Sequence, residues 1–175
     1  GVENEELRSI IVTNDLSLAS VGYTESKGEI NGDCYFVKLD LNGDTIFTKY
    51  FGGPGKDYAN DIVQKPNTEY VICGAQTFTP NPKTQSIMYS MSSLGTSIWA
   101  GNFYNSNDDE AFTSLSNSFQ LPILTAYVRT VPVPAFKLDG NIRGSKPFAN
   151  TYKVNYFCGY EDEIMYSIEA TSDGG

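Results

Sequence analysis

The sequence contains no histidine and only three cysteines among its 175 residues. Without histidine the chain cannot form a Ser-His-Asp or Cys-His catalytic arrangement, nor any metal site that uses imidazole ligands. The cysteines, Cys34, Cys73 and Cys158, are odd in number and show no C-x-x-C spacing, which does not suggest a disulfide framework or a zinc site. Each lies within or beside an apolar stretch, so we expect them to be small buried hydrophobic residues.

Basic residues and long apolar runs are also scarce. The chain has 12 Lys and Arg against 21 Asp and Glu, a net charge of −9. Nucleic acids and anionic membrane surfaces attract basic proteins, so neither is an expected partner. No apolar run approaches the roughly 18 residues that span a bilayer, so no membrane span is expected. The segment 1–6 is acidic and polar, and it does not read as a signal peptide.

Aromatic residues, glycine and proline are abundant, which is typical of a turn-rich β protein. The chain has 12 Tyr, 10 Phe, 16 Gly and 8 Pro, with 40% hydrophobic residues. Apolar or β-branched runs separated by turn residues predict strands over 9–13, 18–24, 33–40 and 45–51. The turn between the last two holds an Asn-Gly pair, which suits a tight hairpin. Together these four strands predict one antiparallel meander.

The same order of residues recurs 52 positions later without a gap. The matched positions include Gly22 and Gly74, Gly43 and Gly95, Ile46 and Ile98, Phe47 and Trp99, Phe51 and Phe103, Asp57 and Asp109, and Ala59 and Ala111. A third, more divergent copy matches 123–126 to 71–74, then predicts a strand over 136–139, a long connection over 140–150 and a return to register at 153–157. Self-similarity at this period indicates a repeat protein.

A period of about 52 residues built from four strands predicts an all-β fold of β-propeller blades. The expected domain covers 1–175, with blades at about 9–60, 61–112 and 113–164 and the first strand of a fourth at 165–175. Propellers have four to eight blades, whereas this chain supplies three and one extra strand. Two expectations stay open: the chain is part of a longer polypeptide, or copies self-associate to complete the ring.

The joint between the first two blades carries a recognisable pattern in Gly52-Gly53, Asp57, Ala59 and Ile62. Further matches are Gly22-Tyr23-Thr24, Asp33, Lys38, Asp40, Gly43, Phe47, Lys49, and the 171–175 segment. Over nearly the whole chain this pattern resembles the bacterial secreted and surface β-propeller repeats of about 50 residues, the SBBP-like group. The resemblance implies an extracellular or cell-envelope location. It carries over no catalytic residue.

Acidic residues recur once per blade at the joint, represented by Asp57, Asp109 and Glu163. In a propeller they would share one rim, where a ring of carboxylates could bind a cation or a cationic partner. Alternatively each carboxylate accepts backbone N–H bonds within its own turn and fixes the connection between blades. The second interpretation is favoured, because repeated positions usually serve the repeated fold.

Three further features have both a functional and a structural interpretation. The stretch 40–44 resembles the start of a calcium loop but lacks the later glutamate, so a hairpin turn is preferred. The aromatic residues Tyr23, Phe78, Tyr104 and Tyr160 could stack on sugars, although packing between blades is favoured. The loops at 25–32, 79–85 and 128–134 differ most between copies and are where specificity would be placed.

These features predict a non-enzymatic propeller scaffold or interaction module of a bacterial surface or secreted protein, with an unidentified protein or glycan partner. No cofactor, metal or catalytic residue is expected. The first alternative is a carbohydrate-binding or adhesin-type propeller. The second is a fragment of a propeller hydrolase that uses carboxylates, for which the spacing of acidic residues selects no pair.

Overall fold

A computed structural model describes residues 2–28, 31–77, 83–103, 109–116, 124–130, 140–144 and 154–157. Every regular element in these segments is a β-strand, and they contain no helix. The predicted all-β class is therefore confirmed.

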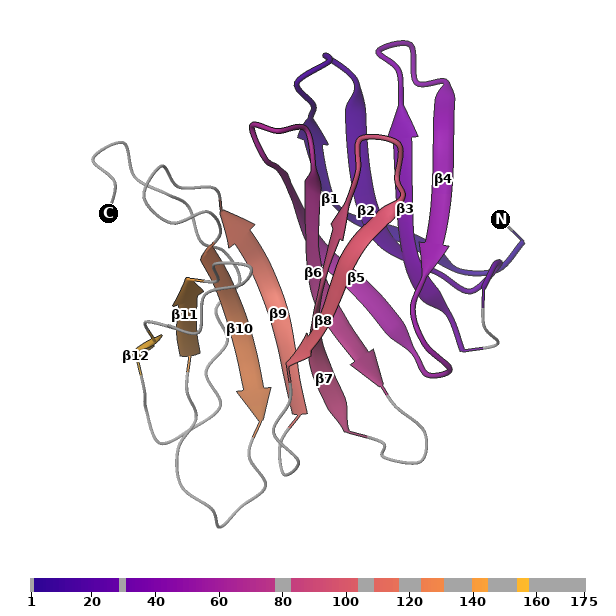
Figure 1. The fold of residues 1–175 in the computed structure, drawn as a ribbon. Helices are drawn as coiled ribbons and strands as arrows, with labels where there is room; N and C mark the ends of the chain where they lie inside the picture. The colour runs from indigo at the N-terminus through magenta and orange to yellow at the C-terminus, as the bar shows by residue number, and fades with distance from the viewer. Residues whose placement is uncertain are drawn as a thin grey trace.

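The strands form three four-stranded antiparallel sheets, each in chain order, which lie side by side with the second in the middle (Figure 1). The first sheet comprises β1 (Glu5–Val12), β2 (Leu18–Thr24), β3 (Asp33–Leu39) and β4 (Thr45–Phe51). The second comprises β5 (Asp57–Gln64), β6 (Tyr70–Thr77), β7 (Thr84–Met91) and β8 (Ser97–Phe103). The third comprises β9 (Asp109–Ser116), β10 (Leu124–Thr130), β11 (Gly140–Gly144) and β12 (Val154–Phe157).

Most strand positions agree with the sequence prediction, but the starts of the sheets and the position of the third strand of the last sheet differ. The sheets begin at Glu5, Asp57 and Asp109, whereas the predicted units begin at 9, 61 and 113. The third strand of the last sheet, β11, occupies Gly140–Gly144, within the stretch predicted to be a connection. That prediction was wrong because the third copy lacks the glycine and aromatic landmarks that set the register in the first two. The predicted strand at 136–139 and the extra strand at 165–175 lie outside the described residues.

Four hairpin turns in the first two sheets share one hydrogen-bonding pattern. In the β3–β4 turn the Asp40 N–H donates to the Asp44 carbonyl (2.9 Å) and the Gly43 N–H to the Asp40 carbonyl (3.1 Å). The β7–β8 turn repeats these bonds around Gly95. Both glycines have positive φ, at 88° and 73°, as the tight turn requires. The predicted hairpin at 40–44 is thus confirmed.

The first strand of each of these sheets contains a β-bulge at an equivalent position. The bulges fall between Leu7 and Ser9 in β1 and between Ala59 and Asp61 in β5. A glycine faces each bulge: a Cβ at Gly22 would collide with the Glu6 carbonyl oxygen, and one at Gly74 with that of Tyr58. Only glycine lets the backbones approach this closely. The sequence match between Gly22 and Gly74 therefore has a shared steric cause.

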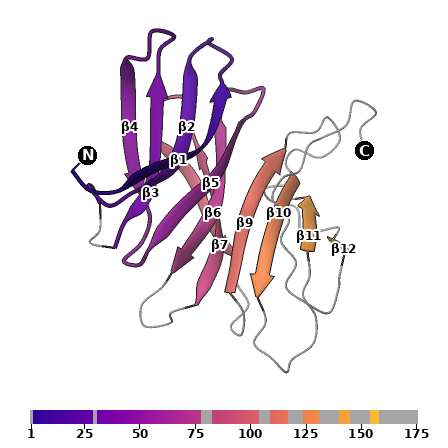
Figure 2. The same ribbon diagram turned by 180° about the vertical axis from the view of Figure 1, so that it is seen from behind.

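The core lies between the sheets. A first cluster joins Ala19, Val21, Cys34 and Phe36 of the first sheet to Ala59, Ile62, Tyr70, Ile72, Ile87 and Met91 of the second. A second cluster joins Val71, Cys73 and Met88 to Leu115 of β9. Seen from behind, β1, β5 and β9 follow one another across the molecule (Figure 2). The next sheet thus packs on the preceding one through its first strand. In the described part of the chain the sheets do not close into a ring.

Candidate functional site

The joint between the first two sheets folds back on the carboxylate of Asp57, the first residue of β5. The Gly53 N–H donates to Asp57 Oδ2 (2.5 Å). The backbone N–H of Asp57 donates to the Gly32 carbonyl (3.1 Å), and that of Lys56 donates to Thr77 Oγ1 (2.6 Å). Asp57 is 0% exposed. This local bond is the structural role that the sequence favoured for a joint carboxylate.

A second carboxylate, Asp33 at the start of β3, converges on the same place. A Cβ added to Gly52 would lie 3.1 Å from Asp33 Oδ1 and closer still to Asp57 Oδ2, so both carboxylates border Gly52. The other oxygen of Asp57, Oδ1, is buried without a hydrogen-bond partner. Burial, and then the charge of Asp33, raise the pKa of Asp57 to about 6. The joint therefore holds an Asp57 carboxyl that takes up a proton more readily than an exposed one.

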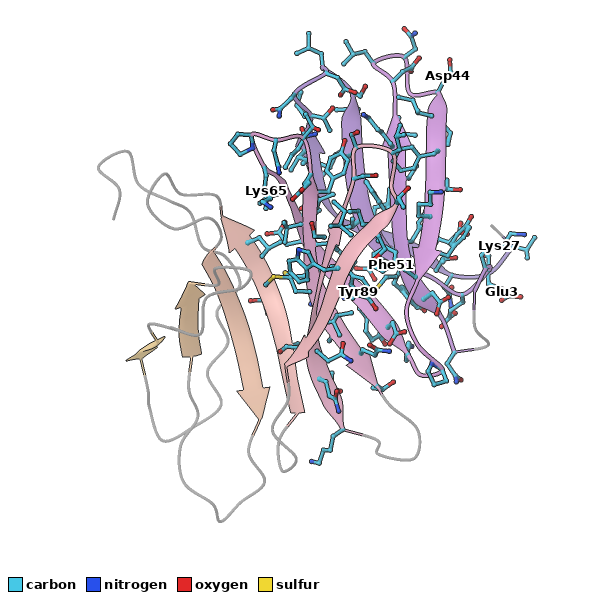
Figure 3. The ribbon with its side chains drawn as sticks, viewed as in Figure 1. Glu3, Lys27, Asp44, Phe51, Lys65 and Tyr89 are labelled. Carbon is cyan, nitrogen blue, oxygen red and sulfur yellow. The ribbon has the colours of Figure 1, made fainter. Side chains whose placement is uncertain are left out.

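Aromatic and thiol groups surround this carboxylate pair. Phe51 and Tyr89 lie together in edge-to-face contact, with ring centroids 4.7 Å apart (Figure 3). Burial raises the pKa of Tyr89 to about 12, and Cys34, Asp57 and Asp33 add to the shift. Burial also raises the pKa of the Cys34 thiol, again with Asp57 and Asp33 contributing. A protonated phenol and an unreactive thiol are the expected forms at neutral pH.

On the other side of the joint, two cationic side chains pack on two tyrosines. The rings of Tyr23 and Tyr58 are 5.1 Å apart, and Lys56 Nζ lies 5.3 Å from the first centroid and 5.4 Å from the second. The Arg8 guanidinium lies 4.8 Å from the Tyr58 centroid. Tyr23 is buried between the two sheets. Its packing role agrees with the favoured interpretation of the aromatic residues.

Asp61 of β5 links the first strands of all three sheets. Its Oδ1 accepts hydrogen bonds from the Ser9 hydroxyl of β1 and from the Ile62 N–H (2.9 Å). Its Oδ2 accepts from the Leu115 N–H (2.7 Å) and the Ser114 hydroxyl (3.1 Å) of β9. Beside it, Arg8 Nη1 donates to Asn60 Oδ1 (2.7 Å). Ser9 and Asp61, like Arg8 and Asn60, are 52 residues apart.

The structure describes the three predicted rim carboxylates, Asp57, Asp109 and Glu163, to different extents. Asp57 is buried in the joint rather than exposed on a surface. Asp109 begins β9, and its side chain lies outside what the structure describes. Glu163 lies outside the described residues, as do the aromatic candidates Phe78, Tyr104 and Tyr160. Ligand binding by these carboxylates stays the alternative interpretation, beside the favoured structural one.

Within the described residues, no group of three or more His, Cys, Asp or Glu side chains could hold a metal ion. In the 40–44 turn, Asp40 Oδ1 accepts from the N–H groups of Asn42 (2.8 Å) and Asp44 (2.9 Å), which occupies that oxygen within the turn. Cys34 and Cys73 are buried and free, as predicted, whereas Cys158 lies outside the described residues.

Sequence reasoning missed two of the residues that organise this region, Asp33 and Asp61. Asp33 was noted only as a match to the repeat pattern, with no role at the joint. Asp61 has a signal in the sequence, because it lies 52 residues after Ser9. Asp57 can bind and release a proton. The hydrogen bonds of Asp61 connect the first strands of the three sheets. The joint presents no open acid pair to a substrate, because Asp33 and Asp57 are both buried.

Neither a scan of protein-family models nor a search of curated proteins gives a match to this chain. Within the part of the chain that the structure describes, there is no helix that could cross a membrane.

Proposed function

We propose that this chain is a β-propeller-type scaffold, a non-enzymatic interaction module of a bacterial surface or secreted protein. The observation that carries the proposal is the equivalence of the sheet-to-sheet contacts. Asp61 binds Ser9 on the preceding sheet and Ser114 on the following one, so one strand position serves both junctions. Stacking of equivalent sheets through their first strands is how a propeller buries both faces of each blade.

The roles of the described acidic residues support a scaffold rather than an enzyme. Asp40 accepts backbone N–H groups of its own turn, Asp57 accepts one from the joint, and Asp61 connects strands. A carboxylate hydrolase needs an acid pair that substrate can reach. The surface location follows from the resemblance of the joint pattern to bacterial surface repeats and is part of the proposal.

The hairpin tips are the proposed surface for a protein partner. The tight turns of the first two sheets point toward the same end of the molecule (Figure 1). Three of them carry an exposed leucine, namely Leu16, Leu41 and Leu94. Several apolar side chains exposed at one end of a constant scaffold are typical of an interaction site.

Binding and turnover assays would test the proposal. We expect a panel of purified envelope and matrix proteins to yield a ligand that the parent binds and the triple variant Leu16→Ser, Leu41→Ser, Leu94→Ser does not. The matched control is Val2→Ser, an exposed apolar residue before β1 and away from the tips, which should retain binding. Turnover of glycoside, ester or peptide substrates, or binding to a glycan array that the triple variant retains, would contradict it.

A further inference from the structure

One face of the first sheet is largely apolar and is exposed along β1 and β4, whereas Ser20 and Val37 in its central strands are buried. Paired residues of antiparallel strands share a face, so the row Leu7, Gly22, Tyr35 and Tyr50 lies on one side of the sheet. The rows beside it are Ile10, Ser20, Val37 and Thr48, and Val12, Leu18, Leu39 and Thr45. We call these twelve residues the open face. Among them Ile10 is 61% exposed, Val12 67% and Leu7 50%.

The second sheet has the same rows 52 residues later. There most of their members in β5, β6 and β7 are covered, whereas Ser97, Ala100 and Asn102 of β8 are exposed. Ile62, the equivalent of Ile10, is 1% exposed, and Ala59, the equivalent of Leu7, is 0% exposed. Tyr70, Ile87 and Met91 take the places of Leu18, Tyr35 and Leu39, and all three are buried. The side chains that cover them are Ala19, Val21, Cys34 and Phe36, from the opposite face of the first sheet. The chain thus shows what kind of surface fits this face.

We infer that the open face is the docking site for a second copy of this chain, which covers it with its third sheet, β9–β12. This inference rests on the proposed function, because it assumes that equivalent sheets stack in one order. The first sheet covers the second, and the second covers β9 through Val71, Cys73 and Met88. The third sheet is next in that order, so it takes the covering position on another copy. Contact between two different surfaces is head-to-tail and builds rings or chains.

The arrangement of polar groups fits the same order. At the existing junctions Ser9 donates to Asp61, and Asp61 accepts from Ser114. The equivalent of Ser9 and Asp61 in β9 is Ser114, since each of the three follows the bulge of its strand, and a second copy would bring Ser114 to Ser9. In this contact between two copies, the two hydroxyl groups can form one hydrogen bond. No carboxylate would be buried there without a hydrogen-bond donor.

The test is the mass of the chain in solution by light scattering over roughly 1–100 µM, where protein interfaces of moderate strength dissociate. The parent should rise above its 19.2 kDa monomer mass with concentration. Ile10→Asp, on the open face, should stay a monomer. Ile98→Asp, on an exposed position of β8 in the second sheet, is the matched control and should assemble like the parent. A parent that stays monomeric, or assembly that survives Ile10→Asp, would overturn the inference.

A mixing experiment identifies the partner surface. The Ile10→Asp chain keeps its third sheet, so with the parent it should form a one-to-one pair and shorten larger assemblies. A symmetric contact between two open faces would give no such pair, and that result would also overturn the inference. Circular dichroism and Trp99 fluorescence verify that each variant is folded. Because both readouts concern only the open face, failure here leaves the binding and turnover assays of the proposed function to be judged separately.

Discussion

The carboxylates of Asp33 and Asp57 both lie next to Gly52, in the segment that connects the first sheet to the second. Both side chains are buried, and Asp57 Oδ1 has no hydrogen-bond partner. Two like charges this close in a buried site disfavour full ionisation. The joint is therefore stabilised when Asp57 binds a proton.

The stability of the fold should depend on pH through Asp57. Its pKa is about 6 in the folded chain against an ordinary value of 3.8, so the folded state holds the proton more tightly. Stability should then fall as pH rises from about 4 to about 6, by up to roughly 3 kcal/mol, and level off above that range. The measurement is urea unfolding of the parent and of Asp57→Asn across pH 4–7.

The difference between the two profiles isolates this residue, since Asp15 and Asp40 have lowered pKa values and act at more acidic pH. Asp33→Asn supplies the control for the pair. Removing that charge should move the step to lower pH without abolishing it, because burial is the larger cause of the shift. Identical slopes for the parent and Asp57→Asn would contradict the assignment.

Among the described residues, two that are not glycine have positive φ, and they predict stabilising substitutions. Leu16 has φ 59° and Thr68 has φ 70°, at equivalent places in the β1–β2 and β5–β6 turns. This conformation costs an L-residue about 1–2 kcal/mol, and glycine adopts it freely. Leu16→Gly and Thr68→Gly should each raise the free energy of unfolding by roughly 0.5–1 kcal/mol, after allowance for the flexibility of glycine.

Gly43→Ala is the matched control with the opposite sign. A Cβ there meets no atom within 4 Å, so only the positive φ of 88° opposes it. We expect a loss of about 1 kcal/mol. Unchanged stability in all three variants would show that these turns relax without strain.

The glycines that face the bulges predict a much larger effect. A Cβ at Gly22 or Gly74 would collide with a backbone carbonyl of the neighbouring strand, which no rotamer change can relieve. Gly22→Ala and Gly74→Ala should each cost more than about 2 kcal/mol in thermal or urea unfolding, well beyond Gly43→Ala. Equal losses at the three glycines would contradict a steric role for the bulge.

Local features of this fold were predictable because each depends on neighbouring residues. The strands β2 and β4, the Asn42-Gly43 turn and the burial of Cys34 and Cys73 all follow from short patterns. The convergence of Asp33 and Asp57 does not, because it depends on how one sheet packs on the next. The register of β11 was missed for a related reason: the glycines and aromatics of residues 131–150 do not fall on the 52-residue register and so cannot align it.

The 52-residue register was only partly informative: it allowed some features to be predicted and not others. It predicted which glycines and aromatic residues correspond, but not that Ser9 and Asp61 would bond each other across sheets. A sequence repeat specifies equivalent positions within each unit. Which equivalent positions touch is decided by the stacking geometry.

The most direct test of the account is a double-mutant cycle on Ser9 and Asp61, which measures the junction between sheets. The free energies of unfolding of the parent, Ser9→Ala, Asp61→Ala and the double variant give the coupling between the two side chains. We predict a favourable coupling of about 1–2 kcal/mol, as expected for a hydrogen bond to a charged group. The control cycle pairs Ser9→Ala with Asp40→Ala in the β3–β4 turn, and its two effects should add. A Ser9–Asp61 coupling no larger than that of the control would contradict the stacking of sheets through positions 52 residues apart.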